Sequence, residues 1–449
     1  MIESLSPEII TIIMLGGILV CAVVTGFPIA FVVGGIGLIV GYLLFGPTAF
    51  EIMYTRTYNL SLNYPFLAVP LFTLMGVVLQ RSGIAEGLYD ALYLWLSGFR
   101  GGLAVVTLVF GTIIAACLGV ITASVTILTL IALAPMIKRG YDKALASGSC
   151  VAGGTLGILI PPSIMLVVYG PMAGLSVAKM LVAAIFPGLL LSGLYITYVS
   201  IRSFLQPKIA PPIPVEERRV PFRKKTAKLL TNLVPPVVLI LSVLGTIFFG
   251  LAPPTEAAAM GSFAALLLAL AYRKFNWGLL KHVGLETMRV SAFVLLIGCL
   301  CYAFVGIFMS AGCGEVVANA VMSAPGGRWG AFAAIMLIVF LLGMFIEWIG
   351  IVFIIVPIFT PLVAALGFDP LWFGMMVCIN LQMAFMTPPL AMSIFVCKGT
   401  AAPELGVTMG DIIRGVYPFV ALVMVGLGLC IAFPQLILWL PSKMIVGYH

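Results

Sequence analysis

The chain has 449 residues, of which 62% are hydrophobic and only 8% carry a charge. Soluble domains carry about 25% charged residues, so the composition excludes an ordinary soluble protein. The formal net charge of +8 does not indicate nucleic-acid binding, because the Lys and Arg residues lie at the ends of apolar runs, where they set the orientation of a membrane protein.

Apolar runs near the start of the chain predict three membrane-spanning helices, at about 8–25, 28–46 and 64–80. Each run is close to the roughly 20 residues that cross a bilayer. The first run lacks a basic leader and a small-residue cleavage site, so we expect a retained span and not a signal peptide. Segments 48–60 and 83–96 carry charge and an apolar face, which favours helices lying along the membrane surface.

Residues 103–136 form a long apolar segment whose centre, from Gly119 to Ser124, is rich in small residues. The segment could be one long helix or a re-entrant hairpin that turns at this centre. A hairpin keeps five basic residues on one face of the membrane, and the positive-inside rule therefore favours it. The five are Arg81, Arg100, Lys138, Arg139 and Lys143.

A broken helix is expected next, at 143–170. Pro161-Pro162 removes two amide donors and disrupts the helix around it. Carbonyl groups freed inside hydrocarbon are tolerated only where protein or a polar cavity satisfies them. A further span is expected at about 177–203. The Pro-rich and then charged segment 206–228 is interpreted as a cytoplasmic linker between two halves of the chain.

The second half repeats the first at an offset of 227 positions. Gly140-Tyr141-Asp142 becomes Gly367-Phe368-Asp369, and Pro161-Pro162 becomes Pro388-Pro389. The repeat predicts a second hairpin at 331–366, a second broken helix at 371–398 and a last span at about 415–440.

Five crossings in the first half, an odd number, require the second half to be inverted. All but four of the 23 Lys and Arg residues then lie on the cytoplasmic face, and both termini are periplasmic. We therefore predict an all-α polytopic membrane protein with an inverted-topology repeat, two re-entrant hairpins and two broken helices, the architecture of elevator-type ion transporters.

The predicted domain division follows from the repeat. The segments are 1–102 (first-half scaffold spans and interfacial helices), 103–170 (first hairpin and broken helix), 171–205 (scaffold span), 206–228 (linker), 229–330 (second-half scaffold), 331–398 (second hairpin and broken helix) and 399–449 (C-terminal span). The two segments that hold the hairpins and broken helices are expected to form one transport domain.

The first hairpin centre and the first broken helix are expected to meet at a binding site. Helix N-termini present free amides that suit an anion, and C-termini present carbonyls that suit Na⁺. The expected Na⁺ ligands are Gly119, Thr122, Gly153, Gly154 and Gly157. The expected anion contacts are Gly119, Thr122, Ser124, Pro161 and Pro162. Gly153 and Gly154 could equally serve close helix packing.

The second site is expected around Glu347, the one carboxylate in its apolar segment. An ionisable residue inside the membrane is a functional-site hypothesis by default. The expected Na⁺ ligands are Glu347, Gly350, Asn380 and Thr387, and the expected anion contacts are Glu347, Thr387 and Pro388. The alternatives are a carboxyl group hydrogen-bonded for structure and an Asn380 that bridges two helices.

Other functional classes lack their residues. The nine cysteines show no metal-site or disulfide spacing, and two histidines exclude a His-rich metal centre. HExxH, GxSxG and the GxxxxGK[ST] phosphate loop are absent from the sequence, so neither these enzyme classes nor Walker-type ATP hydrolysis is supported. No ring of polar residues lines an obvious pore, which argues against a channel. The remaining functional class is a transporter that is driven by an ion gradient.

Four motifs carry a resemblance to a known family. They are 138–142 (KRGYD), 153–164 (GGTLGILIPPSI), 254–259 (PTEAAA) and 387–389 (TPP). In this order they resemble the large membrane subunit, of DctM type, of tripartite ATP-independent periplasmic (TRAP) transporters. The resemblance covers nearly the whole chain.

The resemblance implies an inner-membrane permease that imports organic acids, usually carboxylates, by a Na⁺-coupled elevator movement. It also implies two separate partners, a small four-helix membrane subunit of DctQ type and a periplasmic substrate-binding protein of DctP type. A stand-alone Na⁺/dicarboxylate symporter of related fold is the alternative. Deletion of the binding-protein gene separates the two, because uptake by a symporter would survive.

The chain departs from the family pattern at both hairpin centres. Many relatives have a Ser-Gly-Ser-Ser-like sequence where this chain has Leu118-Gly119-Val120-Ile121-Thr122. Fewer hydroxyl groups leave Thr122, Ser124 and backbone carbonyls to hold an ion there. At the second centre this chain has Glu347, where relatives often have Asp.

Overall fold

The computed structural model describes residues 6–96, 98, 100–212, 221–389 and 391–444. These residues form helices and connecting turns, and no strand occurs among them. Within them, eight helical segments are long and apolar enough to cross a membrane. The prediction of an all-α polytopic membrane protein is confirmed.

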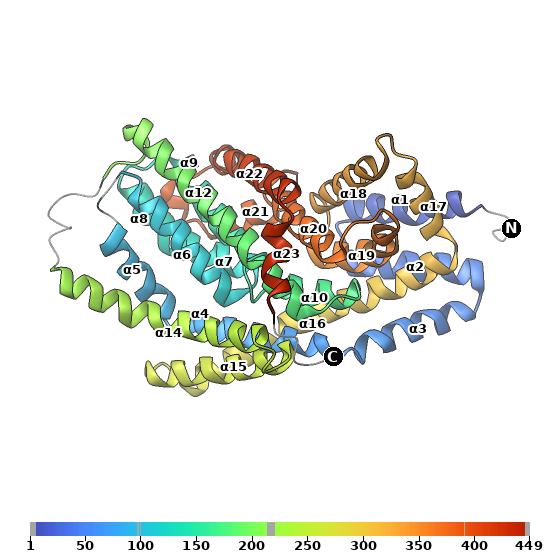
Figure 1. Ribbon diagram of the computed structural model, residues 1–449, viewed down its shortest axis with the longest axis horizontal. Coiled ribbons are helices and arrows are strands. Elements are labelled where there is room, and N and C mark those ends of the chain that lie inside the picture. Colours follow the sequence, from blue (N-terminus) through green and yellow to red (C-terminus); the bar gives the residue numbers. More distant parts are fainter. Residues whose placement is uncertain (1–5, 97, 99, 213–220, 390, 445–449) are drawn as a thin grey trace.

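The first half begins with paired helices and continues into the predicted hairpin and broken helix (Figure 1). Its elements are α1 (Pro7–Thr25), α2 (Ile29–Phe45), α3 (Thr48–Ser61), η1 (Tyr64–Leu67), α4 (Ala68–Arg81), α5 (Ile84–Leu96), α6 (Gly102–Leu118), α7 (Ile121–Leu128), the π-helical turn η2 (Thr129–Leu133), α8 (Ala134–Lys138), α9 (Lys143–Thr155), η3 (Leu156–Ile158), α10 (Ile164–Met172), α11 (Val177–Ala183), α12 (Ile185–Leu205) and η4 (Pro207–Ile209).

The second half follows the same order. Its elements are α14 (Phe222–Phe248), α15 (Pro254–Ala271), α16 (Trp277–Ser310), α17 (Cys313–Met322), α18 (Gly327–Gly343), α19 (Trp348–Ala365), α20 (Pro370–Ala384), α21 (Met392–Thr400), η5 (Pro403–Leu405), α22 (Met409–Ala432) and α23 (Gln435–Ser442). The long helix α16 stands where the first half has α3, η1 and α4, which are separated by a turn at Leu62 and Asn63.

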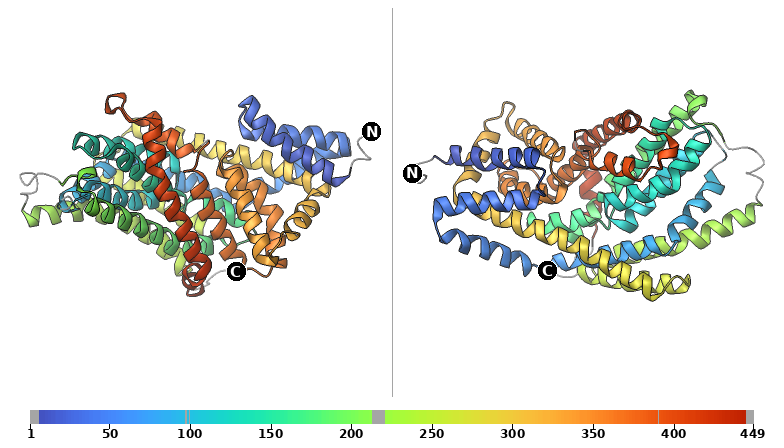
Figure 2. Two further views of the ribbon diagram at one scale, coloured as in Figure 1. Left: turned by 90° about the horizontal axis from the view of Figure 1, so that it is seen from above. Right: turned by 180° about the vertical axis from the view of Figure 1, so that it is seen from behind.

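The contacts between helices repeat with the sequence. α4 packs on α15, and its counterpart α16 packs on α2. In the same way α5 packs on α14 and α17 on α1, while α7 packs on α21 and α10 on α19. The pairs α1–α2 and α14–α15 lie at opposite ends of the molecule (Figure 1). Figure 2 shows from two further directions that the two hairpins also occupy opposite halves. The packing therefore has the pairwise symmetry expected of two related halves.

Matching capping residues begin the two broken helices. The carboxylate of Asp142 accepts a hydrogen bond of 2.9 Å from the amide of Leu145 at the start of α9. Asp369 accepts hydrogen bonds from the amides of Leu371 and Trp372 at the start of α20. Each carboxylate satisfies amide groups that have no partner inside the helix, so the repeated Asp defines where each broken helix starts.

Two predicted boundaries are wrong. The linker was expected to end at residue 228, but α14 begins at Phe222, so Arg223, Lys224 and Lys225 lie in its first turn. Lys228 also lies in α14, and Lys208 lies in η4. The charged residues 216–219 lie outside the described residues. The last span was expected to be continuous to residue 440, but Phe433 and Pro434 separate α22 from α23, because a proline cannot continue the hydrogen bonds of the preceding helix.

Candidate functional site

The first hairpin turns at Gly119, as predicted. α6 ends there because Gly119 has a φ of 61°, in the left-handed region that glycine adopts without strain. Val120 is extended, and α7 begins at Ile121. The two ends of the hairpin meet, since the amide of Leu103 donates to the Tyr141 hydroxyl (3.3 Å) and Thr107 Oγ1 lies 3.8 Å from Met136 Sδ. A straight helix would separate Thr107 from Met136 by about 44 Å, and Leu103 from Tyr141 by more.

The second hairpin also folds back on itself. α18 ends at Gly343 and α19 begins at Trp348, after an extended Glu347. Its two ends are joined by aromatic side chains, because the rings of Trp329 and Phe368 lie 5.2 Å apart. These residues correspond to the Gly102 and Tyr141 positions of the first half. The prediction of a second hairpin is therefore confirmed.

The two breaks are closed by the same kind of contact. The Ser163 hydroxyl donates to the carbonyl of Ile158 (2.5 Å), and the Ser393 hydroxyl donates to the carbonyl of Phe385 (2.7 Å). Ile158 and Phe385 are equivalent at the 227-residue offset. In both halves a serine thus donates a hydrogen bond to a backbone carbonyl at the break. Without the serine this buried carbonyl would lack a partner. The peptide bonds Pro161-Pro162 and Pro388-Pro389 are cis.

Three glycines hold the first hairpin against the first broken helix. A Cβ atom added at Gly119 would lie 2.7 Å from the Pro162 carbonyl oxygen, and one at Gly154 would lie 2.4 Å from Val125 Cγ2. A Cβ atom at Gly157 would lie 2.9 Å from Ser124 Oγ. The hairpin centre therefore meets the break as predicted, and only glycine permits this approach of the two backbones.

Gly153 and Gly154 do not break the helix. Both belong to α9, which runs without interruption to Thr155, and the break comes later, around Pro161-Pro162. Gly153 packs on Gly111 of α6. A Cβ atom added at Gly111 would lie 3.0 Å from Gly153 Cα. The two residues serve close helix packing, the alternative that the sequence left open, and their role as Na⁺ ligands stays a prediction.

In the second half the contacts of Asn380 and Gly350 differ from the expected arrangement. Asn380 is 2% exposed, and its Nδ2 donates to the carbonyl of Met336 (2.6 Å) in the middle of α18. It therefore bridges two helices, away from the hairpin centre. Gly350 packs near Ile346 and Ile29. Thr387 Oγ1 donates to the carbonyl of Met383 (2.9 Å) in its own helix.

Both hairpin centres open on one cavity of about 420 Å³, which we call the central cavity. It receives Thr122 from the first hairpin and Glu347 from the second, although the sequence placed these residues in two separate sites. Its lining residues are Gly26, Phe27, Ile29, Val120, Ile121, Thr122, Gly343, Phe345, Ile346, Glu347, Trp348, Phe385, Ala391 and Met392. Glu347 is the one ionisable side chain among them.

Three helices begin at the central cavity. α7 starts at Ile121, α19 at Trp348 and α21 at Met392, and all three residues line the cavity. A helix N-terminus carries amides without intrahelical partners and the positive end of the helix dipole. The cavity therefore combines one carboxylate with three sources of partial positive charge, a setting that can hold a cation and an anion side by side.

Several predicted site residues do not line the central cavity. They are Gly119, Ser124, Gly153, Gly154, Gly157, Pro161, Pro162, Gly350, Asn380, Thr387 and Pro388. Sequence reasoning in turn missed Gly26, Phe27 and Ile29, which join α1 to α2. A signal for them existed, because Phe27-Pro28 stands at the position that Pro254-Thr255 occupies in the second half. Among the described residues no group of three or more His, Cys, Asp or Glu could hold a metal ion.

The comparison with protein families decides what kind of molecule carries this cavity. A family model described as "Tripartite ATP-independent periplasmic transporter, DctM component" matches residues 15–436. The chain belongs to the DctM family. It is therefore the large permease component of a TRAP transporter, and a transporter rather than an enzyme.

Individual relatives agree with the DctM family. The C4-dicarboxylate TRAP transporter large permease protein DctM of Pseudomonas aeruginosa is 31% identical over 401 residues, which are 89% of this chain and 91% of the relative. The isethionate TRAP transporter permease protein DctMQ of Oleidesulfovibrio alaskensis is 28% identical over 364 residues, which are 81% of this chain and 56% of the relative.

A solved structure shares the fold of this DctM chain. It is the crystal structure of the Alcanivorax borkumensis YdaH transporter, with a TM-score of 0.63 over 86% of this chain and 89% of that chain. At 16% sequence identity the likeness concerns the fold alone.

Proposed function

We propose that this DctM chain imports an organic acid anion together with Na⁺, and that both bind in the central cavity. The observation that carries the proposal is the meeting of three helix N-termini with Glu347 in that cavity. Free amides and helix dipoles bind an anionic group. The Glu347 carboxylate supplies the negative oxygen ligands that a hard cation prefers.

The two ligands support each other's binding. Among the residues that the structure describes, no Lys or Arg lines the central cavity, so an organic anion placed beside an ionised Glu347 would meet a like charge. A Na⁺ ion bound to the carboxylate removes that repulsion, which is strong in a medium of low dielectric constant. Anion binding then depends on Na⁺, and this linkage is what couples uptake to the Na⁺ gradient. The names of two relatives include a C4-dicarboxylate and a sulfonate, isethionate, so we propose an organic acid with at least one anionic group.

The movement we propose is a displacement of the transport domain along the scaffold. The two halves engage the scaffold differently: α4 packs on α6 and α10, whereas its counterpart α16 packs on α19. A Cβ atom added at Gly76 would lie 3.0 Å from the Leu118 carbonyl oxygen, and one at Gly298 would lie 2.6 Å from Phe353 Cζ.

These two contacts are not equivalent in the repeat. Gly76 corresponds to residue 303, five residues beyond Gly298, which is about 8 Å along a helix. A transport domain midway along its path would make equivalent contacts in both halves. The unequal contacts support a position nearer one end of that path, as an elevator mechanism requires.

We further propose two partners and a location. A periplasmic binding protein would deliver the anion, and a small membrane subunit would accompany the permease in the bacterial inner membrane. The family description names a tripartite periplasmic transporter, and this supports both partners. The linker would face the cytoplasm, and both termini the periplasm.

The test is uptake by proteoliposomes that contain all three components. A panel of dicarboxylates, sugar acids and sulfonates is offered with inward Na⁺ or K⁺ gradients of equal size. We expect accumulation of at least one acid with Na⁺, little with K⁺, and none without the binding protein. Equal uptake with K⁺ would contradict Na⁺ coupling. Uptake without the binding protein would instead favour a stand-alone symporter.

A further inference from the structure

A second cavity adjoins the first hairpin centre. It has a volume of about 250 Å³ and is formed by α4, α16 and the start of α7. We call it the side cavity. Val120 and Thr122 line both the side cavity and the central cavity. The two cavities therefore adjoin each other at the turn of the first hairpin.

The side cavity is lined by polar groups and carries both signs of charge. Its polar side chains are Thr73, Gln80, Arg81, Thr122, Thr126 and Glu286. In the described part of the chain, Arg81 is the basic residue of this lining, and no basic residue lines the central cavity. A guanidinium group beside hydroxyl and amide side chains suits an anionic oxygen group, because it donates parallel hydrogen bonds to carboxylates and sulfonate-like groups.

Arg81 is paired with a carboxylate of the protein itself. Arg81 Nη2 lies 3.4 Å from Glu286 Oε2, and His282 Nε2 lies 3.0 Å from the same oxygen. The side chains of Arg81 and Glu286 are 46% and 38% exposed. Solvent screens an ion pair of this exposure and makes it weak, so another carboxylate can take the place of Glu286.

We propose that the side cavity is a second binding site for the transported organic anion, in which Arg81 binds the anion after it passes Thr122 and Glu286 is the carboxylate that the anion displaces. The site rests on the proposed function, which supplies the anion. Glu286 keeps His282 as a partner when Arg81 turns to the ligand. Competition from Glu286 weakens anion binding, and weak binding favours release. Because the charge distribution predicts a cytoplasmic Arg81, the site serves release to the cytoplasm.

The experiment measures how internal anion inhibits uptake. Proteoliposomes with all three components take up radiolabelled succinate from outside, and unlabelled succinate is loaded inside at increasing concentrations. If the wild type carries another acid of the panel and not succinate, that acid replaces it. External binding protein engages only transporters whose periplasmic face is outward, so the internal acid probes the cytoplasmic face. The measured quantity is the internal concentration that halves the uptake rate.

The variants predict shifts of opposite sign. Glu286→Gln removes the competing charge and should lower the half-inhibitory concentration about three- to fivefold, as expected for a partly exposed ion pair. Arg81→Gln should raise it at least about tenfold, because a charge-assisted hydrogen bond to the anion is lost. Arg81→Lys keeps the charge and should fall between Arg81→Gln and the wild type. A misfolded protein cannot produce a lowered value in one variant and a raised value in the other.

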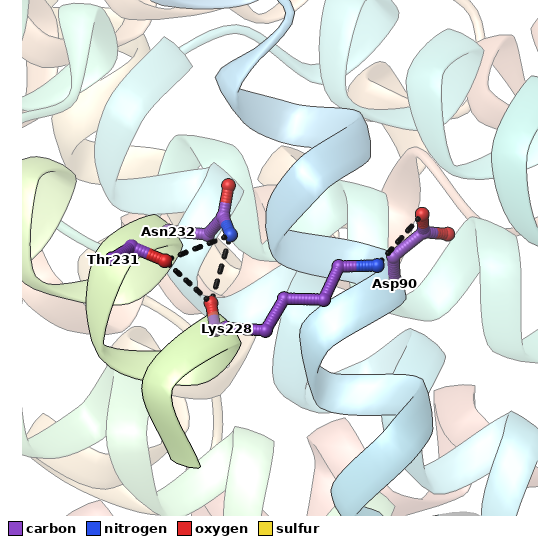
Figure 3. Close-up of polar contacts among 4 residues, drawn as sticks. All are labelled: Asp90, Lys228, Thr231 and Asn232. Carbon is purple, nitrogen blue, oxygen red and sulfur yellow. Dashed lines mark hydrogen bonds and ion pairs between the residues drawn. The ribbon is translucent and has the colours of Figure 1, made fainter. Parts of the chain in front are cut away.

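A matched ion pair elsewhere provides the control. Lys228 Nζ lies 3.3 Å from Asp90 Oδ2, with side chains 42% and 66% exposed, and it joins α14 to α5 (Figure 3). Neither residue lines the side cavity or the central cavity. Lys228 is about as exposed as Arg81. Lys228→Gln therefore removes a surface cation of similar exposure without touching the proposed site, and should leave the half-inhibitory concentration within twofold of the wild type.

Three results would overturn the proposal. The first is a shift below twofold in both Arg81→Gln and Glu286→Gln, and the second is a shift of the same sign in both. The third is an effect that occurs only in vesicles containing phosphatidylglycerol, since Arg81 would then bind a lipid phosphate. Wild-type uptake with unshifted variants rejects the side-cavity site alone, whereas absence of wild-type uptake rejects the proposed function and the site with it.

Discussion

Thr122 and Glu347 belong to opposite halves of the chain and line the same cavity. Each lies at the centre of a hairpin, and the two hairpins are related by the internal repeat. Because the repeat is inverted, its two copies bring equivalent backbone turns to a common place between them. A single cavity therefore receives one hydroxyl group, one carboxylate and three helix N-termini, which no segment of the sequence could supply alone.

Replacement of Glu347 by Gln should abolish most Na⁺-dependent uptake. Loss of a charged ligand removes about 1.5–3 kcal/mol of interaction, so the Na⁺ concentration for half-maximal uptake should rise at least about tenfold. Glu347→Asp keeps the charge and should retain part of the activity. Glu315 is exposed on α17, so Glu315→Gln is the control. Unchanged Na⁺ dependence in Glu347→Gln would remove the carboxylate from the proposed site.

Gly154 should not tolerate a side chain. The added Cβ atom of Gly154→Ala would lie 2.4 Å from Val125 Cγ2 and 2.7 Å from Val125 Cα, so the first hairpin must shift away from α9. Overpacking of this kind costs about 1–3 kcal/mol. We expect a lower thermal unfolding temperature in detergent and reduced uptake. Gly193 of α12 has no neighbouring atom within 4 Å of a built Cβ, and Gly193→Ala should match the wild type. Equal stability of both variants would contradict the packing.

The sequence predicts the hairpins and breaks because their causes are local. Gly119 ends α6 with a backbone conformation that favours glycine, and Pro161-Pro162 removes two amides, so both events can be read from the residues themselves. The repeat then transfers each prediction to the second half. The role of Gly153 and Gly154 could not be read in this way, because glycine serves an ion site and a close helix contact equally well. The packing of Gly153 on Gly111 and of Gly154 on Val125 shows the close helix contact, and the role of the two glycines as Na⁺ ligands stays a prediction.

Asn380 shows a second limit of the sequence. Its place on a broken helix predicted a Na⁺ ligand, but the direction of its side chain depends on packing with α18, and there it contacts the Met336 carbonyl. Thr122 and Glu347 were predicted in two separate sites, and their meeting in one cavity follows from the contacts between the halves. Such long-range contacts leave no periodic pattern in a chain that is apolar almost throughout.

Asn380→Ala should therefore lower stability. The change removes the hydrogen bond that Asn380 Nδ2 donates to the Met336 carbonyl, and the net contribution of such a bond is about 0.5–1.5 kcal/mol. The expected result is a lower thermal unfolding temperature with an unchanged Na⁺ concentration for half-maximal uptake. Asn319 on α17 is exposed, and Asn319→Ala should change stability by less than about 0.5 kcal/mol. A raised Na⁺ requirement in Asn380→Ala would instead support the ligand role predicted from the sequence.

The double proline of α14 explains why such a pair does not always break a helix. Pro235-Pro236 lies inside α14, which continues from Phe222 to Phe248. Pro235 has no amide to donate to the Thr231 carbonyl four residues earlier, and the Tyr272 hydroxyl donates to that carbonyl instead, at 2.8 Å. A partner from α15's end thus replaces the missing intrahelical bond.

Tyr272→Phe tests this replacement. The variant keeps the ring and removes only the hydroxyl group, so the Thr231 carbonyl loses its donor. The site is partly open to solvent, and the expected loss of stability is therefore small, about 0.5–1.5 kcal/mol, measured as a lower unfolding temperature in detergent. Protease cleavage near Thr231 should also become faster, because a helix without this bond opens locally more often. Tyr417→Phe is the control, because Tyr417 is an exposed tyrosine of α22. Equal unfolding temperatures and cleavage rates in the two variants would show that α14 is continuous without the help of Tyr272.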